Sequence, residues 1–252
     1  MDSFISWIGG KKALKNKIVK EFPDKGTYRR YVEVFGGAGW VLFSSEKHAE
    51  IEVYNDINGK LVNLFRCVKY HAEEVQKELE LTLVSREQFY DVKAQMEVQG
   101  LTDIQRAARF FILIKESFGS DLHSFGLKAR DINKAKRYLL LVAERLRFVV
   151  IENQDFRKIL NNNDRPDTLF YLDPPYYKAE DYYSVKFTED DHVELKGMLN
   201  NIKGKFILSY NDCDFIRQLY KGNNIIEVSR NNNLVSAKGG ARYPELIIKN
   251  FT

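Results

Sequence analysis

The regular alternation of short apolar runs with helical segments is the feature that most restricts how this sequence can fold. Apolar runs typical of buried strands occupy residues 31–35, 51–55, 148–151, 168–172, 206–210, 225–228 and 246–248. Helical periodicity marks the segments between most of these runs, among them 61–70, 156–160 and 192–199. This alternation predicts an α/β fold with a parallel, doubly wound sheet and helices on both faces. No helical segment separates the last two runs, so we expect them to pair as a hairpin and add an antiparallel edge.

Residues 71–146 interrupt this alternation, since they contain helical patterns at 75–83, 88–98 and 104–114 and no convincing strand. We therefore predict a sheet domain formed by residues 1–70 and 147–252, with residues 71–146 as a helical insertion. Residues 105–147 hold ten basic and four acidic side chains, an excess larger than the formal charge of +4 on the whole chain. Such a segment is either a polyanion-binding surface or an ordinary solvated helical surface.

Composition excludes several classes of protein. Hydrophobic residues make up 44% of the 252 residues, which is enough for a sizeable core. No apolar run approaches the ~18 residues of a membrane span, and the N-terminus lacks the basic and apolar regions of a secretory signal. The two cysteines, Cys67 and Cys213, and the four scattered histidines show no metal-ligand spacing. We expect no metal and no disulfide scaffold, as in a reducing cytoplasm.

A glycine-rich turn follows the first predicted strand, with the sequence Phe35-Gly36-Gly37-Ala38-Gly39. Glycines let the backbone turn tightly and approach a ligand, and a helix predicted at 40–46 would offer free N–H groups. The second strand ends at Asp56, 17 residues after Gly39, where a carboxylate can accept hydrogen bonds from ribose hydroxyls. The spacing matches neither G-x-G-x-x-G nor a phosphate-binding loop. The turn and the carboxylate together favour a nucleoside-type cofactor over an ordinary strand–helix turn.

The sequence Asp173-Pro174-Pro175-Tyr176 follows the strand predicted at 168–172. Ligands of open α/β sheets bind at the carboxyl ends of the strands. The two prolines fix the backbone and remove two N–H donors, so the Asp173 carboxylate and the Pro174 carbonyl form a double acceptor. This pair suits an exocyclic amino group, and Tyr176 supplies a flat surface for a planar ring. A rigid turn without function is the weaker alternative.

These two motifs resemble those of the amino-methyltransferases of DNA that use S-adenosylmethionine. Their order, with the glycine motif first, then the helical insertion, then Asp-Pro-Pro-Tyr, is similar to the Dam-type (D12 class, alpha group) DNA adenine N6-methyltransferases. The resemblance implies a Rossmann-like methyltransferase sheet. It covers residues 4–70 and 148–252 well and the insertion poorly.

Shorter motifs extend the resemblance along the chain. Trp7-Ile-Gly-Gly-Lys11 resembles the family's N-terminal motif, which implies that Trp7 and Lys11 contact the cofactor, Lys11 at its carboxylate. Asn55-Asp-Ile-Asn58 matches the acidic second motif, and Asn153-Gln-Asp-Phe156 is similar to the motif that holds the cofactor's adenine. The segment 245–251 looks like the family's last strand. Taken singly, Trp7 fits a core residue, Lys11 a solvated lysine, and Asp155-Phe156 a helix cap followed by a core aromatic.

The resemblance implies a site-specific enzyme that moves the methyl group of S-adenosylmethionine to N6 of an adenine flipped out of duplex DNA. The catalytic residues it implies are Asp173, Pro174 and Tyr176. The cofactor residues it implies are Trp7, Lys11, Phe35, Gly36, Gly37, Gly39, Asp56, Asp155, Phe156 and Asp173.

The insertion departs from the family's pattern. Members that read GATC carry a longer insertion with an Arg-Tyr-Asn stretch and an Asn-x-Pro-Phe-Gly-x-Tyr loop, to which only Ser124-Phe-Gly126 and the basic run 128–137 are comparable. The family's Glu-Pro-Phe is Glu33-Val34-Phe35 here. The target sequence is therefore not carried over. We expect the insertion to clamp DNA phosphates through Lys128, Arg130, Lys134 and Arg137.

Two other readings stay open at this point. One is methylation of cytosine at N4, although those enzymes more often have Ser in place of Asp173. The other is a catalytically silent nucleic-acid-binding module on the same fold. The expected partner is double-stranded DNA, which a monomer would bind. We expect no association with a membrane and no metal. The expected location is the cytoplasm of a bacterial or phage-infected bacterial cell. A cognate restriction endonuclease is a candidate partner.

Overall fold

A computed structural model describes residues 1–80, 82–127, 132–178, 186–231 and 242–252 of the chain. Its centre is one seven-stranded sheet with the order β3-β2-β1-β4-β5-β7-β6. The first five strands run parallel, and β7 pairs antiparallel with both β5 and β6. The strands are β1 (Arg30–Glu33), β2 (Ile51–Asn55), β3 (Val149–Glu152), β4 (Thr168–Leu172), β5 (Lys205–Asn211), β6 (Asn224–Asn231) and β7 (Arg242–Lys249). The predicted parallel sheet with an antiparallel edge hairpin is confirmed.

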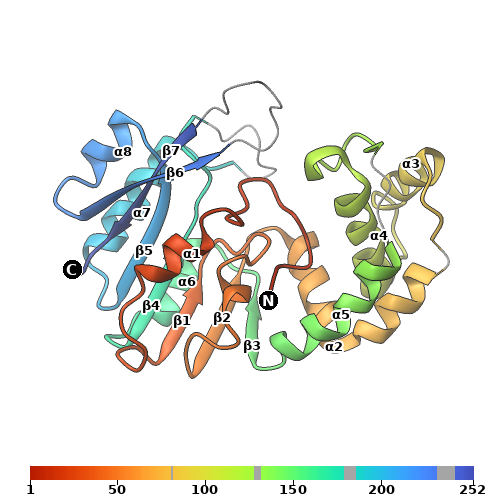
Figure 1. Cartoon of the computed structure of the whole chain (residues 1–252), viewed down its shortest axis with the longest axis horizontal. Helices are drawn as coiled ribbons and strands as arrows, with labels where there is room; N and C mark the ends of the chain where they lie inside the picture. Colours follow the sequence, from red (N-terminus) through yellow and green to blue (C-terminus); the bar gives the residue numbers. More distant parts are fainter. Residues whose placement is uncertain (81, 128–131, 179–185, 232–241) are drawn as a thin grey trace.

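Helices cover both faces of the sheet and fill the insertion (Figure 1). They are α1 (Lys15–Lys20), α2 (Gly59–Glu80), α3 (Arg86–Gln95), α4 (Asp103–Glu116), α5 (Ile132–Leu146), α6 (Phe156–Asn163), α7 (Glu189–Asn200) and α8 (Asp214–Leu219). Two of them begin at a threonine whose hydroxyl accepts from the third backbone N–H of the helix, Thr102 for α4 and Thr188 for α7. Among the described residues, no helix has the length and apolar character needed to cross a membrane.

Alternate residues of each central strand face two separate hydrophobic clusters. In β1, Tyr31 belongs to the cluster that also contains residues of α1, α2, α4 and α5, whereas Val32 belongs to the cluster that contains residues of α6, α7 and α8. Both residues are fully buried, as are Leu169 and Phe170, which occupy the equivalent places in β4. This period of two, with both sides apolar, is what a parallel sheet covered on both faces requires.

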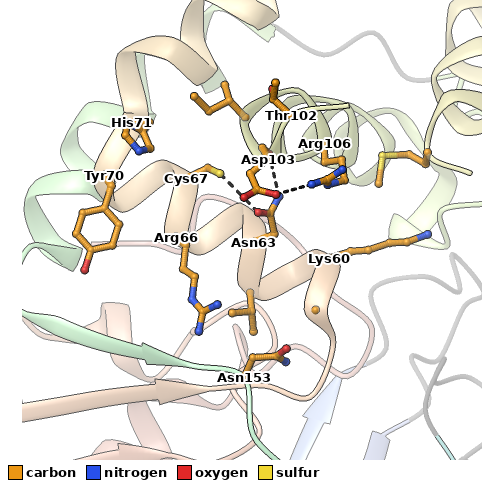
Figure 2. A pocket seen from close by; sticks show the side chains of 14 residues that line it. Lys60, Asn63, Arg66, Cys67, Tyr70, His71, Thr102, Asp103, Arg106 and Asn153 are labelled. Atoms are coloured by element: carbon orange, nitrogen blue, oxygen red, sulfur yellow. Dashed lines mark hydrogen bonds and ion pairs between the residues drawn. The ribbon is translucent and has the colours of Figure 1, made fainter. Parts of the chain in front are cut away.

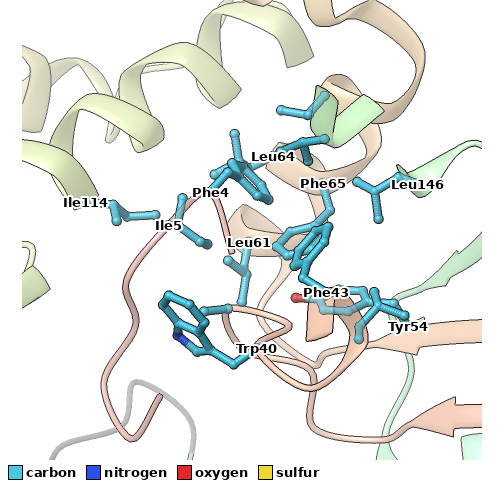
Figure 3. Packing of buried hydrophobic residues seen from close by; sticks show 14 of the residues in the cluster. Phe4, Ile5, Trp40, Phe43, Tyr54, Leu61, Leu64, Phe65, Ile114 and Leu146 are labelled. Atoms are coloured by element: carbon cyan, nitrogen blue, oxygen red, sulfur yellow. The ribbon is translucent and has the colours of Figure 1, made fainter. Parts of the chain in front are cut away.

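The helices α2 to α5 lie between β2 and β3 in the chain and beside the sheet in space (Figure 1). The helix α2 starts directly after β2 and continues past residue 71, where His71 has non-helical angles (φ −140°, ψ 40°) and the helix kinks. Phe4, from the N-terminal segment, packs against Phe65 of α2 at a ring-centroid distance of 5.0 Å (Figure 3). It also stacks on Phe111 of α4 at a ring-centroid distance of 6.4 Å. One hydrophobic core thus runs from the sheet into the insertion, and the division at residues 70 and 147 stays a prediction.

The prediction of a helix at residues 40–46 was wrong. The chain turns there at Gly39 and forms only a short 3-10 helix, Leu42–Ser44. The four consecutive residues from Trp40 to Phe43 are all buried. An amphipathic helix would have to leave part of this run exposed, so the segment instead winds through the core. The glycine turn therefore has no long helix behind it, and its ligand-facing N–H groups are those of the turn itself.

Candidate active site

Most of the predicted cofactor residues meet at the carboxyl ends of β1, β2 and β4. They surround a cavity of about 250 Å³. The predicted residues that line it are Trp7, Lys11, Phe35, Gly36, Gly37, Gly39, Asp56 and Asp173. Parallel strands end at one edge of a sheet, so motifs far apart in the sequence become neighbours there.

The glycine turn has a shape that other residues would disturb. Gly37 and Gly39 have positive φ values of 50° and 68°, a region that favours glycine. Gly36 is needed for space, since a Cβ there would lie 2.2 Å from Cε2 of the buried Tyr54. The Tyr54 hydroxyl donates to the Gly37 carbonyl at 2.6 Å. The turn is thus packed directly onto the ring of a core tyrosine.

Asp56 ties the second strand to the glycine turn. One carboxylate oxygen accepts from the backbone N–H of Gly37 and the other from that of Asn58, both at 2.8 Å. Burial raises the pKa of Asp56, and these backbone hydrogen bonds oppose the rise. A carboxylate has about four lone-pair positions, so this one can bind the turn and still accept from a ligand in the cavity.

Asp173, at the end of β4, is paired with the buried Lys11. Its Oδ1 lies 2.8 Å from Lys11 Nζ, which also donates to the Gly9 carbonyl at 2.8 Å. The Asp173 side chain is 17% exposed and that of Lys11 is 5% exposed. Burial raises the pKa of Asp173 to about 6, with Lys11 lowering it in opposition. The carboxylate is therefore the main form at neutral pH, in surroundings where its charge is weakly screened.

Tyr176 stands next to this ion pair. Lys11 Nζ lies 4.6 Å from the centre of the Tyr176 ring, and the Tyr176 hydroxyl donates to Glu245 of β7. Tyr176 is not among the residues that line the cavity, whereas Pro175 is, and Pro174 is buried. Asp173 thus faces the cavity and also lies near Tyr176. A ligand in the cavity and a second ligand beside Tyr176 could therefore both reach Asp173.

Asp155 and Phe156 are not among the residues that line the cavity. Asp155 is the N-cap of α6, where its carboxylate accepts from the Arg157 N–H at 2.9 Å. Phe156 is buried, with its ring centroid 5.9 Å from that of Phe35, which does line the cavity. Asp155 is thus a helix cap and Phe156 a core aromatic, as expected if neither residue binds the cofactor. Their direct contact with the cofactor stays a prediction.

Only two of the four predicted DNA contacts fall within the described residues. Lys128 and Arg130 lie outside them. Lys134 and Arg137 are exposed near the start of α5. Their contact with DNA stays a prediction.

Several residues of the lining were not predicted, among them Glu33 and the segment from Ser120 to His123. Glu33, at the end of β1, is 2% exposed and accepts from the Tyr31 hydroxyl at 2.7 Å, and burial raises its pKa to about 8. A carboxyl residue at the end of an apolar strand is a signal that could have identified it. The segment from Ser120 to His123 also lines the cavity. No local pattern marks it, because it reaches the cavity only through the packing of α4.

A larger cavity, of about 610 Å³, lies along α2 and the start of α4 (Figure 2). Its cations already have partners, since Lys60 pairs with Glu97 at 3.1 Å and Arg106 with Asp103 at 2.6 Å. Arg66 donates to the Ile151 carbonyl of β3, the strand at the edge of the sheet. None of the predicted catalytic or cofactor residues lines this cavity, and Asn153 is the only residue of the Asn153-Gln-Asp-Phe156 motif that does. Its size alone therefore does not make it the active site.

Residues 7–234, most of the chain, match the family of D12 class N6 adenine-specific DNA methyltransferases. The chain belongs to this family. Membership confirms the resemblance stated from the motifs and the adenine-specific chemistry expected from it. The family uses S-adenosylmethionine as methyl donor in general, and its substrate is DNA.

Several named methyltransferases are similar to this one along most of their length. The type II methyltransferase M1.LlaDCHI of Lactococcus lactis is 27% identical, over 98% of this chain and 95% of its own. The type II methyltransferase M.MjaIII of Methanocaldococcus jannaschii is also 27% identical, over 98% of both chains. The DNA adenine methylase of Haemophilus influenzae is 25% identical, over 87% of this chain and 82% of its own.

Proposed function

We propose that this methyltransferase binds S-adenosylmethionine in the cavity of about 250 Å³ and methylates N6 of an adenine flipped out of duplex DNA at a specific sequence. The position of Asp173 carries this proposal. Its carboxylate faces the cavity and lies beside Tyr176, with Lys11 in contact with both. One carboxylate can therefore meet an amino group at the boundary between a cofactor site and a base site.

The lining suits a charged nucleoside. Trp7 and Phe35 offer aromatic surfaces, and Asp56 has lone pairs left for ribose hydroxyls. Lys11 is the cation that would face the carboxylate of S-adenosylmethionine. Lys11 would then interact with two carboxylates, that of the cofactor and that of Asp173. When bound, S-adenosylmethionine supplies an electrophilic methyl group on a sulfonium.

The residues around the acceptor would act by position and charge. The N6 lone pair of adenine is delocalised into the ring, so the amino group is a poor nucleophile. Hydrogen bonds to Asp173 and the Pro174 carbonyl favour a pyramidal nitrogen and stabilise the positive charge that develops on it. Flipping a base out of the duplex costs roughly a few kcal/mol, and stacking on Tyr176 would offset about 1–3 kcal/mol of that.

The insertion would hold the DNA through the basic segment that includes Lys134 and Arg137. One asymmetric clamp needs no second copy, so we propose a monomer. The relatives from Lactococcus and Methanocaldococcus are named type II methyltransferases, which makes a cognate restriction endonuclease a partner to look for. We propose the cytoplasm of a bacterial or phage-infected cell as its place of action.

Transfer of a labelled methyl group from S-adenosylmethionine to unmethylated duplex DNA tests the proposal. Hydrolysis identifies the modified base, and sequencing locates it. Label in N6-methyladenine within one short motif is the expected result. Label in cytosine would show that cytosine, not adenine, is the methyl acceptor. If the protein binds the cofactor but no label enters DNA, the proposal that DNA is the substrate is refuted.

A further inference from the structure

The hydroxyl of Tyr176 is bonded to a buried carboxylate from a distant part of the chain. Glu245 of β7 is 2% exposed, and its Oε2 accepts from the Tyr176 hydroxyl. The other oxygen, Oε1, accepts from Nε of Arg230 on the neighbouring strand β6. Arg230 is paired in register with Tyr243, two residues before Glu245, so the two side chains lie on the same face of the hairpin.

We propose that Glu245 and Arg230 are positioning residues that fix the ring of Tyr176 for stacking on the flipped adenine. This inference rests on the proposed function. The ring is held at two points, by Lys11 over its face at 4.6 Å and by Glu245 at its hydroxyl. A carboxylate this deeply buried is costly to keep charged unless it is paired, and Arg230 supplies that pairing. Arg230 thus holds Glu245, and Glu245 holds the ring.

If Glu245 only stabilised the hairpin, its loss would lower kcat equally with and without the Tyr176 hydroxyl, or not at all. Another ion pair of the same region, Arg217 with Glu227 of β6, joins the hairpin to α8 at 2.6 Å. The Glu227 side chain is 68% exposed and is paired with Arg217, not with Tyr176. Glu227→Gln is therefore a matched control for the loss of one carboxylate from the hairpin.

A double-mutant cycle decides between the two roles. The variants are Glu245→Ala, Tyr176→Phe and the two together, with Glu245→Gln as the conservative form that keeps an acceptor for the hydroxyl. The readouts are kcat and KM on unmethylated duplex DNA that carries the target motif, the Kd for S-adenosylmethionine, and the melting temperature. With 2-aminopurine at the target adenine, fluorescence reports stacking of the flipped base directly.

We expect Glu245→Ala to lower kcat about tenfold, to leave the Kd for S-adenosylmethionine unchanged, and to raise the fluorescence of the flipped base. In the Tyr176→Phe background the same change should have little further effect, Glu245→Gln should recover part of the loss, and Glu227→Gln should match the wild type. An equal loss of kcat in both backgrounds, or no loss, would overturn the inference. If Glu245→Ala does not fold, the same cycle with Glu245→Gln decides.

Failure of the inference and failure of the function give different results. Wild-type protein that methylates adenine in DNA while the cycle shows no coupling overturns only the positioning role. Wild-type protein that transfers no methyl group to DNA overturns the proposed function, and the positioning role with it.

Discussion

Replacing Gly36 by alanine should distort the glycine turn that forms one wall of the cofactor cavity. The new Cβ would lie 2.2 Å from Cε2 of Tyr54, where ordinary contact begins at 3.4 Å. One of the two must therefore move by roughly 1 Å. The Tyr54 ring is fully buried and stacks on Phe65 with a centroid distance of 4.1 Å, so it has no free space to move into. The turn is the part that must yield.

The expected cost follows from these contacts. Overpacking of a core costs about 1–3 kcal/mol, and weakening the bond from Tyr54 to the Gly37 carbonyl adds about 1 kcal/mol. The free energy of unfolding should therefore fall by about 2–4 kcal/mol. Because Gly37 also donates to Asp56, the cavity changes shape, and the Kd for S-adenosylmethionine should rise about tenfold or more.

Urea denaturation and titration calorimetry measure the two quantities. The matched control is Gly197→Ala in α7, where an added Cβ meets no atom within 4 Å. That change should raise the free energy of unfolding by up to ~1 kcal/mol through helix propensity. A Gly36→Ala protein with wild-type stability and wild-type cofactor affinity would refute the steric argument.

The other predictions concern the catalytic carboxylate, the DNA contacts and the helix cap. Asp173→Asn should lower kcat by about 10²–10³ because it removes the charge that stabilises the transition state, while cofactor binding survives; near-normal turnover would contradict the role. In wild type, kcat/KM should fall as the pH is lowered through about 6, because burial raises the pKa of Asp173 to that value and protonation removes the negative charge that stabilises the transition state. A pH–rate profile that is flat down to pH ~4, the usual range of an aspartate, would contradict this role. Lys134→Ala and Arg137→Ala should each reduce the salt dependence of DNA binding by roughly one unit of slope, and a slope equal to that of wild type removes that residue from the interface. Asp155→Ala should lower the free energy of unfolding by about 1 kcal/mol as the loss of an N-cap, and a large rise in the Kd for S-adenosylmethionine would show a direct contact instead.

The strands and the order of the motifs could be read from the sequence because both are local patterns. A buried strand in a parallel sheet is a short apolar run wherever it occurs, and Asp173-Pro174-Pro175-Tyr176 keeps its meaning at the end of any such strand. The prediction of a helix at 40–46 was wrong because a local pattern was not sufficient there. Whether a short apolar run such as residues 40–43 forms a helix or winds through the core depends on what surrounds it, which no local period shows.

Tertiary structure alone decided how the groups in the site are partnered. The sequence by itself determined that Asp56, Asp173 and the glycine turn lie at one edge of the sheet, because parallel strands place their carboxyl ends together. It could not determine that Lys11 pairs with Asp173, that the segment 120–123 closes the cavity, or that Glu245 bonds to Tyr176. These contacts join residues that lie tens to more than a hundred positions apart, and they exist only because the insertion and the edge hairpin pack where they do.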